Sequence, residues 1–307
     1  MPALNANSVR QATDLPFETW ADDEGPDAAL ARLLATCQAT GNGISVAVDE
    51  TMRADFALLL LDNLQAPKRA FCDETVGHLR AMKDTAEEAK LRTCAHLNDA
   101  AASAGFAALE VGVTERDIAQ IIQAHYKANG ATTEFTIVAF GQNGAFPHHH
   151  NGDTKLEEGM AVLIDTGCRL DGYPSDMTRC GWFGDTPENE FLKIADVLEQ
   201  AVQAALAAAK SGVTARDVDA AARGVIEAAG YGEYFLHRTG HGLGIDIHEP
   251  PYITATSTTV LEEGHVFSIE PGIYLPGRFG IRLEDIVILK SDGPSILSDL
   301  ARDIWTR

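Results

Sequence analysis

The chain has 307 residues and 45% hydrophobic content, enough to bury one large core or two ordinary ones. Its 45 acidic and 24 basic residues give a formal net charge of −21, which argues against nucleic acid or an anionic membrane as a partner. The sequence has no apolar run of roughly 18 residues, no secretory signal at its start and five cysteines without CxxC spacing. A cytoplasmic protein with reduced thiols is therefore expected.

The first 82 residues predict a small α/β unit. "PDAALARLLATCQATG" predicts a helix, "GISVAVD" a strand and "MRADFALLLLDNLQA" a second helix. The composition becomes strongly charged around "CDETVGHLRAMKDTAEEAKLR", and a long helix is predicted from "TAEEAKLRTCAHLNDAAASAGFAAL". We therefore expect one domain over residues 1–82 and a second over residues 83–307.

An internal repeat lies within the second domain. "GVTERDIAQIIQAHYKANG" from Gly112 and "GVTARDVDAAARGVIEAAG" from Gly212 align without a gap, at an offset of 212 − 112 = 100 residues. Each copy has a threonine in N-cap position, apolar residues at helical spacing and a closing glycine, and each follows a long alanine-rich helix. Two copies are too few for a solenoid, so we expect two halves packed about a pseudo-twofold axis, with a cleft where they meet.

Two aspartates flank a predicted hairpin after the repeat's first copy. "MAVLIDTG" and "SDMTRCGWF" predict strands joined by "CRLDGYP", whose Asp-Gly favours a tight turn. A turn at Leu170 and Asp171 would set Asp165 and Asp176 directly opposite each other, roughly 4.5–5.5 Å apart between Cβ atoms. Two carboxylates that close are not both expected to stay ionised without a cation.

The C-terminal part repeats this arrangement. "GHVFSIEPGIYLPGRFGIRLEDIVIL" predicts a hairpin around Pro276 and Gly277, in which Glu270 and Glu284 also face each other. If the pseudo-twofold packing brings both hairpins together, four carboxylates share one site. Two divalent cations would balance their charge, as in sites with metals roughly 3.5–4 Å apart.

Histidines in glycine-rich sequence supply further candidates. "YFLHRTGHGLGIDIHEPPYI" contains His237, His241 and His248, and His148 begins the run "HHH" ahead of the first hairpin. Imidazole can bind a metal or transfer a proton, and the glycines allow the backbone to approach a site closely. His149 and His150 are expected to be ordinary loop residues.

The order and spacing of Asp165, Asp176, His241, Glu270 and Glu284 resemble those of the metal ligands in the pita-bread metallopeptidases. This family includes Xaa-Pro dipeptidase (prolidase), aminopeptidase P and methionine aminopeptidase. The motifs "GHGLGIDIHE", "SIEPGIY" and "RLEDIVIL" look specifically like the Xaa-Pro branch, over about residues 83–307. The resemblance implies an α+β fold, a pita-bread (creatinase/aminopeptidase-like) catalytic domain with a pseudo-twofold αβ repeat. It also implies hydrolysis of the N-terminal bond of a peptide with proline second.

The resemblance further implies roles for individual residues. Asp165 would bind one metal, Asp176 and Glu284 would bridge both, and His241 and Glu270 would bind the second. Glu270 would also be the general base. Contacts with the substrate or with the transition state are implied for His148, His237, His248, Tyr274 and Arg282.

The carboxylate-rich ligand set suits manganese, cobalt, zinc or iron, and the sequence does not choose among the four. A homodimer is the implied assembly. The alternatives are methionine aminopeptidase activity, a creatinase-like hydrolase without metals, and a binding protein on the same scaffold. All five ligands are kept, which weighs against the last two.

The N-terminal region departs from the family's pattern. The roughly 80 residues before the catalytic part resemble only the second half of the N-terminal domain of a prolidase or aminopeptidase P. We expect a partial, shortened creatinase-type domain at residues 1–82.

Overall fold

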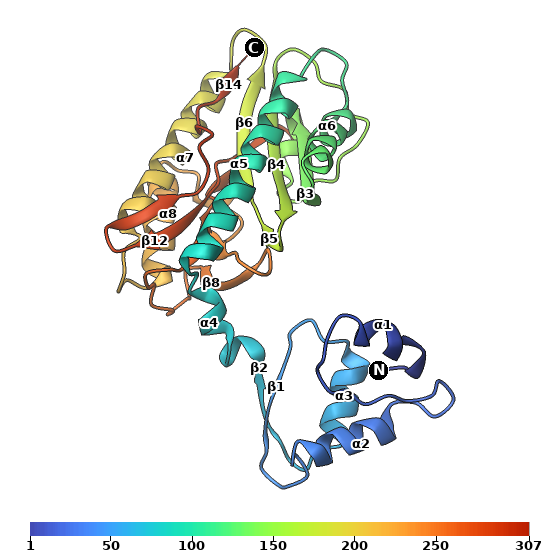
Figure 1. Cartoon of the computed structure of the whole chain (residues 1–307). Helices are drawn as coiled ribbons and strands as arrows, with labels where there is room; N and C mark the ends of the chain where they lie inside the picture. The colour runs from blue at the N-terminus through green and yellow to red at the C-terminus, as the bar shows by residue number, and fades with distance from the viewer. Residues whose placement is uncertain (307) are drawn as a thin grey trace. The chain divides into compact units, whose positions relative to one another are not determined.

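The computed structural model describes residues 1–306 and divides into two compact units, Met1–His78 and Leu79–Arg307 (Figure 1). No helix among the described residues is long and apolar enough to cross a membrane. Each unit is described separately below. The short helix α4 (Gly77–Ala81) runs across the division between them.

The first unit is a small α/β structure. Two parallel strands, β1 (Ser45–Val48) and β2 (Lys68–Phe71), pair with Ser45 opposite Lys68, and helix α3 (Ala54–Asp62) connects them. Parallel strands require such a crossover connection. Helix α2 (Asp27–Thr36) confirms the first predicted helix, whereas α1 (Ala6–Arg10) and β2 were not predicted. The unit also contains the 3₁₀ turns η1 (Ala3–Asn5) and η2 (Cys72–Glu74).

The second unit contains two successive sets of helices and strands. The first set comprises α5 (Thr85–Ala107), α6 (Glu115–Ala128), β3 (Thr132–Phe140), η3 (Gly141–Ala145), β4 (Met160–Leu170), β5 (Tyr173–Pro174) and β6 (Met177–Phe183). The second comprises α7 (Asn189–Ala208), α8 (Ala215–Ala228), η4 (Gly232–Tyr234), β7 (Gly240–Gly242), β8 (Glu249–Ile253), β9 (Val266–Ile269), β10 (Gly272–Leu275), β11 (Phe279–Arg282), β12 (Asp285–Lys290) and β13 (Gly293–Ile296). A last strand, β14 (Trp305–Thr306), ends the described chain.

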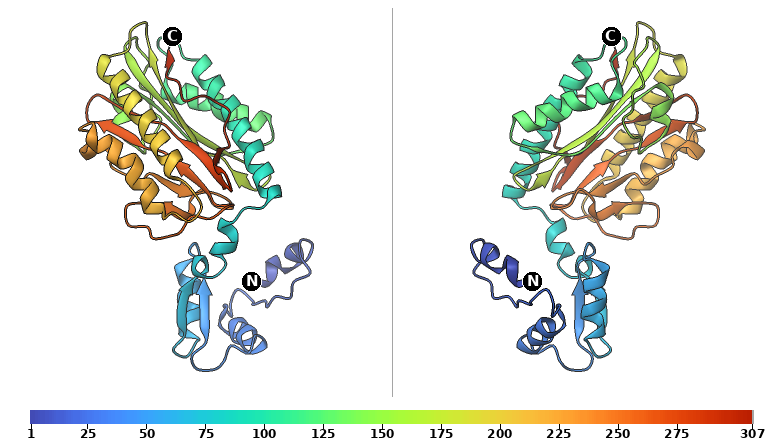
Figure 2. Two further views of the ribbon diagram at one scale, coloured as in Figure 1. Left: turned by 90° about the vertical axis from the view of Figure 1, so that its left-hand side faces the viewer. Right: turned by 90° about the vertical axis from the view of Figure 1, so that its right-hand side faces the viewer.

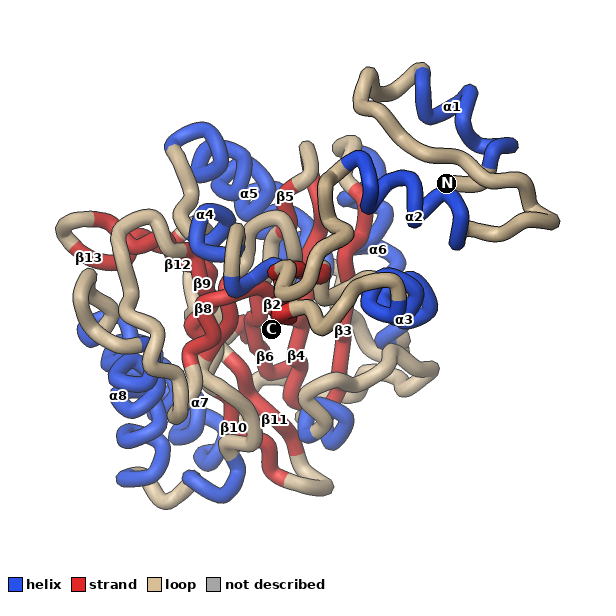
Figure 3. The backbone as a smooth tube through the Cα atoms, turned by 90° about the horizontal axis from the view of Figure 1, so that it is seen from below, coloured by secondary structure: helices blue, strands red, loops and turns tan. Residues whose placement is uncertain are grey.

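The strands form two larger sheets and one small ribbon. The first sheet has the order β14-β6-β4-β3, the second has the order β13-β12-β9-β7-β8, and β10 pairs only with β11. Helices α5 and α6 lie on one side of the strands and α7 and α8 on the other (Figure 2). Seen from below, the strands run through the middle of this unit with helices at both sides (Figure 3).

The two copies of the repeat have matching local structure. Thr114 and Thr214 each cap a helix in a reciprocal capping box, α6 with Asp117 and α8 with Asp217. The turn before each helix makes the same backbone bond, since Gly112 N donates to Leu156 O and Gly212 N donates to Leu261 O, both at 2.8 Å. The predicted repeat is therefore a structural one.

Strand β4 lies between two apolar cores, and its alternation sets the direction of Asp165. Ile164 packs in the core that contains residues of α5 and α6, whereas Leu163 packs in the core that contains residues of α7 and α8. Successive side chains of a strand point to opposite faces, so Asp165 shares the face of Leu163. That face is directed toward the second half of the unit, whose strands β10 and β11 contribute Ile273 and Ile281 to the same core.

The first hairpin turns one residue later than predicted. Leu170 pairs with Tyr173, and the two loop residues Asp171 and Gly172 have φ values of 49° and 86°. Positive φ at both central positions is the geometry that favours Asp-Gly in a type I′ turn. The shift places Asp165 opposite Thr178. The prediction that Asp165 and Asp176 lie directly opposite each other is therefore wrong, and they are diagonal neighbours on the same face.

The second hairpin turns where the sequence predicts it. Leu275 pairs with Phe279 across a loop that contains Pro276 and Gly277, and Gly277 has a φ of 74°. A three-residue loop with glycine in the left-handed region is a common hairpin connection.

The turn geometry predicts opposite effects for two exposed glycines. Gly172→Ala would force a Cβ into the left-handed region and lower the free energy of unfolding by about 1–2 kcal/mol. The matched control Gly224→Ala lies within α8, where a new Cβ meets nothing within 4 Å, and should raise that free energy by up to about 1 kcal/mol. Urea unfolding of both variants measures the two effects. Equal stability of Gly172→Ala and wild type would contradict the turn.

Candidate metal centre

The two carboxylates of the first hairpin are buried close together. Asp165 is 7% exposed and Asp176 is 8% exposed. Because Asp165 pairs with Thr178, and Thr178 follows Asp176 by two residues, all three side chains project from one face of the hairpin. On this face, the two carboxylates point toward the second hairpin.

The second pair of carboxylates lies across its own hairpin. Gly272 pairs with Arg282, and Asp285 pairs with Ile269. Both pairs belong to one continuous register, which sets Glu270 opposite Glu284, as the sequence predicts. Ser268 Oγ donates to Glu270 Oε1 at 3.0 Å.

Direct hydrogen bonds join the two hairpins at this point. Thr178 Oγ1 donates to Glu284 Oε2 at 2.6 Å, and Arg282 Nη2 donates to Asp165 Oδ2 at 2.5 Å. Thr178 also accepts a bond from Arg282 Nε at 2.9 Å. The second hairpin therefore reaches the face of the first that carries Asp165 and Asp176.

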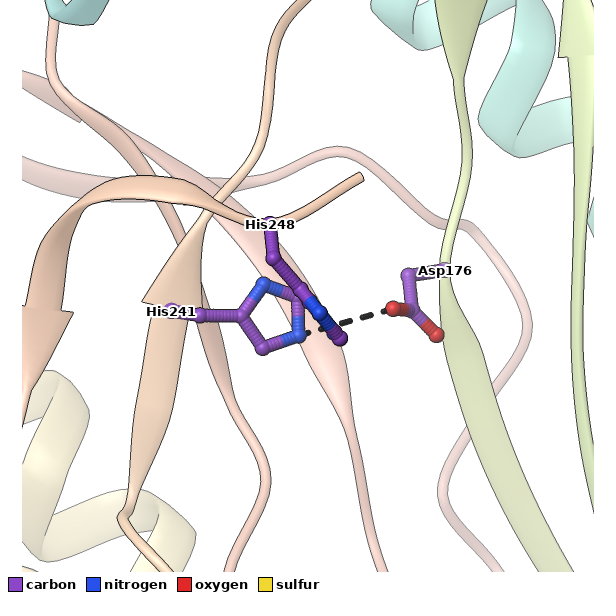
Figure 4. A group of neighbouring side chains, drawn as sticks. All are labelled: Asp176, His241 and His248. Carbon is purple, nitrogen blue, oxygen red and sulfur yellow. Dashed lines mark ion pairs between the residues drawn. The ribbon is translucent and has the colours of Figure 1, made fainter. Parts of the chain in front are cut away.

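His241 completes this cluster from strand β7. Its Nε2 lies 3.6 Å from Asp176 Oδ2 and 3.4 Å from Glu270 Oε1, and Figure 4 shows the imidazole directed at Asp176. Its Nδ1 lies 3.1 Å from Gly242 O, so Nδ1 carries the proton and Nε2 presents a lone pair. Burial and the neighbouring His248 lower the pKa of His241 to about 3, which keeps the ring neutral.

The possible ligand atoms form overlapping groups. In three groups, all donor atoms lie within 4.8 Å of one another. The first group is Asp165, Asp176 and Glu284, and the second is His241, Glu270 and Glu284, so these two share Glu284. The third group is Asp176, His241 and His248. The ring of His248 packs edge-on against that of His241, with centroids 4.2 Å apart.

Burial and mutual repulsion make the carboxylates hard to ionise. Burial, followed by the charges of Glu284 and Asp165, raises the pKa of Asp176 well above its ordinary value. Burial and the charge of Glu270 raise the pKa of Glu284. Burial raises the pKa of Glu270 to about 7, although Arg282 and Ser268 act in the opposite direction.

This donor set fits divalent cations. Asp165 Oδ1 is buried and has no hydrogen-bond partner among residues 1–306, although buried oxygens are normally satisfied. Arg282 is the one cation hydrogen-bonded to these four carboxylates within the described chain. Carboxylate oxygens with a single imidazole suit manganese, cobalt, zinc or iron. A cation at each of the first two groups would satisfy the free oxygen and offset the repulsion.

A cavity of about 940 Å³ opens beside the cluster. The predicted residues His148, His237, His248 and Arg282 line it, together with all five candidate ligands. Its apolar walls are Phe135, Ile137, Phe146, Pro147, Leu236 and Ile247. Burial, followed by the charge of Arg282, lowers the pKa of His237 to about 4, so this histidine is neutral near pH 7.

Tyr274 lies behind the cavity wall, where direct contact with a substrate had been expected. The residue is 1% exposed, and its hydroxyl lies 2.7 Å from His237 Nε2 and accepts a 2.7 Å bond from Arg282 Nη1. Tyr274 therefore positions two cavity residues without lining the cavity. His149, expected from the sequence to be an ordinary loop residue, hydrogen-bonds Glu115 at 2.8 Å.

Sequence reasoning missed several residues that hold the site. Thr178 bonds Glu284, and Ser268 accepts the backbone N–H of His241 at 2.9 Å while it donates to Glu270. Each lies two residues from a predicted ligand on the same strand face, Thr178 from Asp176 and Ser268 from Glu270. The period-two spacing could have identified both. The cavity residue Arg238 and the apolar walls had no comparable pattern.

The raised pKa of Glu270 predicts a pH-dependent stability of the metal-free protein. A folded pKa of about 7, above the ordinary 4.5, means that stability is fully present below about pH 4.5 and is lost as pH rises through about 7. Glu270→Gln removes this titration. Its free energy of unfolding relative to wild type should rise by on the order of 3 kcal/mol between about pH 4.5 and about pH 8.

Urea unfolding with a chelator measures this difference, and Glu263→Gln, an exposed glutamate of the same segment, is the control. Added divalent metal should stabilise wild type more than the Glu270 variant. A difference that does not change with pH would contradict the buried, repelling arrangement.

Comparison with known proteins identifies the family of this chain. Residues 89–291 match the model of metallopeptidase family M24. A probable dipeptidase PepE of Mycobacterium tuberculosis is 40% identical over 299 residues, covering 95% of this chain and 78% of the relative. The Xaa-Pro dipeptidase of Lactobacillus delbrueckii subsp. lactis is 37% identical over 306 residues, covering 95% of this chain and 80% of the relative.

Solved structures agree with the predicted fold. A dipeptidase from Pyrococcus horikoshii OT3 superposes with a TM-score of 0.91 at 34% identity, covering all of this chain and 84% of the other. The prolidase of Pyrococcus furiosus superposes with a TM-score of 0.86 at 31% identity, covering 98% of this chain and 87% of the other. The α+β pita-bread prediction is thus confirmed, and with it a hydrolytic enzyme that requires divalent metal. This chain belongs to metallopeptidase family M24.

Proposed function

We propose that this protein hydrolyses the N-terminal bond of peptides with proline in second position, using two divalent metal ions. The supporting observation is that two groups of ligand atoms share Glu284. Asp165 and Asp176 would hold one ion with Glu284, and His241 and Glu270 would hold the other with it. The 3.6 Å between His241 and Asp176 supports Asp176 as a second shared ligand.

Within this proposal, Glu270 is the general base. Bound divalent cations would lower the pKa of a coordinated water and polarise the scissile carbonyl. Glu270 lies among the ligands, and Ser268 occupies its Oε1, which leaves Oε2 to take the proton of the attacking water. The same carboxylic acid would then deliver that proton to the leaving nitrogen.

The histidines would orient the peptide and stabilise charge. The neutral His237 ring donates from Nδ1 to the Arg238 carbonyl and accepts at Nε2 from the Tyr274 hydroxyl, while His148 and His248 lie exposed on the cavity lining. They are suited to hydrogen-bond the carbonyl that becomes an oxyanion. Arg282 bonds Asp165, Thr178 and Tyr274, which supports a role in holding the carboxylate cluster in place.

The names of the relatives support the proline preference. The Lactobacillus delbrueckii relative is an Xaa-Pro dipeptidase, and the Pyrococcus furiosus structure is a prolidase. An imide nitrogen carries no N–H, so a proline ring must be recognised by shape. The apolar walls formed by residues such as Phe135 and Ile137 suit this mode of recognition.

The proposal also covers the metal's identity, the assembly, the location and the domain boundary. Manganese, cobalt, zinc and iron all fit the ligands. A homodimer, a cytoplasmic location and a shortened creatinase-type domain at residues 1–82 ahead of a catalytic domain at residues 83–307 stay predictions. Methionine aminopeptidase activity is the alternative that uses the same five ligands.

Paired peptides test the substrate class. After metal removal and reloading with manganese, cobalt or zinc, Ala-Pro and Ala-Pro-Ala should be cleaved far faster than Ala-Ala. Cleavage of Ala-Pro alone identifies a dipeptidase, and cleavage of Ala-Pro-Ala identifies an aminopeptidase P activity. Release of methionine from Met-Ala-Ala with no cleavage of either proline peptide would refute the proposal.

Removal of a shared ligand tests the metal assignment. Glu284→Gln or Asp176→Asn should lower kcat/KM by more than roughly 100-fold and lower the metal content below two ions per chain, because each removes a ligand common to both ions. Elemental analysis after gel filtration measures the metal, and Glu263→Gln is the control. Wild-type turnover in either variant would exclude the dinuclear assignment.

A further inference from the structure

The segment between β3 and β4 supplies part of the cavity wall. Phe146, Pro147 and His148 line the cavity from this segment, directly after the turn η3. His148 is exposed and lies outside any helix or strand. A side chain on a loop keeps its direction only when the rest of the loop is fixed. The position of His148 therefore depends on what holds this segment.

One buried carboxylate holds the segment from both sides. Glu115, the first residue of α6, is 0% exposed. Its Oε1 accepts hydrogen bonds from Phe140 N at 2.9 Å and from Asn143 Nδ2 at 2.8 Å. Its Oε2 accepts a bond from Gly152 N at 2.9 Å and lies 2.8 Å from His149 Nε2. These partners flank the cavity-lining stretch on both sides, so one side chain ties down both of its ends.

The second half makes the same turn and helix without a carboxylate. At the repeat offset of 100 residues, Ala215 stands where the first half has Glu115, and it is also 0% exposed. The two helices begin alike, since Glu115 N donates to Thr154 O at 3.3 Å and Ala215 N donates to Thr259 O at 2.9 Å. Neither the helix nor its turn therefore requires an acid at this position.

The second half has its buried acid one turn later, against a different segment of the cavity. Asp219 is 0% exposed, whereas its counterpart in the first half is Ala119. Asp219 Oδ1 accepts bonds from Thr239 Oγ1 at 2.8 Å and from Thr239 N at 3.2 Å, two residues after His237. In each half, one buried acid on the second helix thus holds a cavity segment that carries a histidine.

The hydrogen bonds of Glu115 favour one conformation of its segment. A buried carboxylate is costly without donors, and its donors offset that cost. Two of them are the backbone N–H groups of Phe140 and Gly152, which define the path of the chain. A displaced segment would leave an oxygen of Glu115 buried without these donors. The favoured conformation is the one in which His148 lines the cavity.

We propose that Glu115 is a positioning residue that holds residues 140–152 so that His148 faces the bound peptide. This inference rests on the proposed function and adds a residue outside the cavity lining. His148 can form its hydrogen bond with the peptide only when the segment is fixed. A displacement of about 1 Å can cost roughly 100-fold in rate.

A double-mutant cycle tests this role. Glu115→Gln keeps the shape of the side chain but sets an NH₂ group against N–H donors. It should lower kcat/KM for the proline peptide that wild type cleaves by roughly 10- to 100-fold, and it should cause no further loss in His148→Ala. In His237→Ala the full loss should remain. An equal loss in both histidine backgrounds, or no loss in wild type, overturns the proposal.

Hydrogen exchange measures the segment itself and does not depend on turnover. In Glu115→Gln, the amides of residues 140–152 should exchange roughly 10- to 100-fold faster, because bonds to a charged acceptor are lost. Residues 254–260, which bond to α8 in the second half, should exchange as in wild type, and the metal content should not change. The control is Glu157→Gln, an exposed glutamate just beyond the segment. Equally faster exchange in both segments overturns the proposal.

Milder variants keep the test decisive if Glu115→Gln does not fold. His149→Leu removes one donor to Glu115, and His149→Gln keeps an N–H group there; 16% of the His149 side chain is exposed. The leucine variant should lose activity and protection of residues 140–152, and the glutamine variant should stay nearer to wild type. Equal behaviour of the two variants overturns the proposal.

Exchange also distinguishes failure of this inference from failure of the proposed function. If wild type cleaves no proline peptide with any metal, the proposed hydrolysis fails, whereas faster exchange confined to residues 140–152 in Glu115→Gln still supports the positioning role. Cleavage by wild type together with unchanged exchange in the variant leaves the proposed hydrolysis intact and overturns this inference.

Discussion

Four carboxylates on two facing hairpins, three of them buried and Glu270 partly buried, are the constraint on which this structure depends. Burial raises the pKa of Asp176 and of Glu284; the charge of Glu284 raises that of Asp176 further, and the charge of Glu270 raises that of Glu284. Asp165 keeps an oxygen without a hydrogen-bond donor among residues 1–306. Nothing in packing alone explains such an arrangement, because one buried unpaired charge is already costly. Bound cations would offset this cost. Metal binding at the proposed site would therefore be coupled to folding.

The internal duplication explains how the carboxylates come together. Each half supplies a capped helix and a hairpin, and the alternation of β4 directs Asp165 away from the core of its own half. Arg282 then joins the hairpins through Asp165 and Thr178. The proposed metal ligands thus lie in strands or directly beside a strand end, where geometry is held better than in long loops.

The sequence predicted the repeat, both hairpins and the residues of the cluster, because each rests on a local pattern: a cap, an Asp-Gly turn or period-two spacing. It placed the first turn one residue early. That error changed Asp165 and Asp176 from diagonal neighbours into a direct pair. The Asp-Gly dipeptide favours Asp171 and Gly172 as the two loop residues, whereas the prediction centred the turn on Leu170 and Asp171. The spacing marks Thr178 as a residue on the ligand face, but its bond to Glu284 crosses the two halves and is not visible in the sequence. Tyr274 bonds Arg282 and lies beside His237 within the second half, which no local pattern indicates.

The two cavity arginines have different surroundings in one site. A guanidinium that is surrounded by acceptors, as Arg282 is, contributes geometry and compensates part of the cluster's charge. The guanidinium of Arg238 instead lies over the ring of Tyr252, 4.9 Å from the centroid. Both arginines line the same cavity, so they differ in their partners and not in their charge.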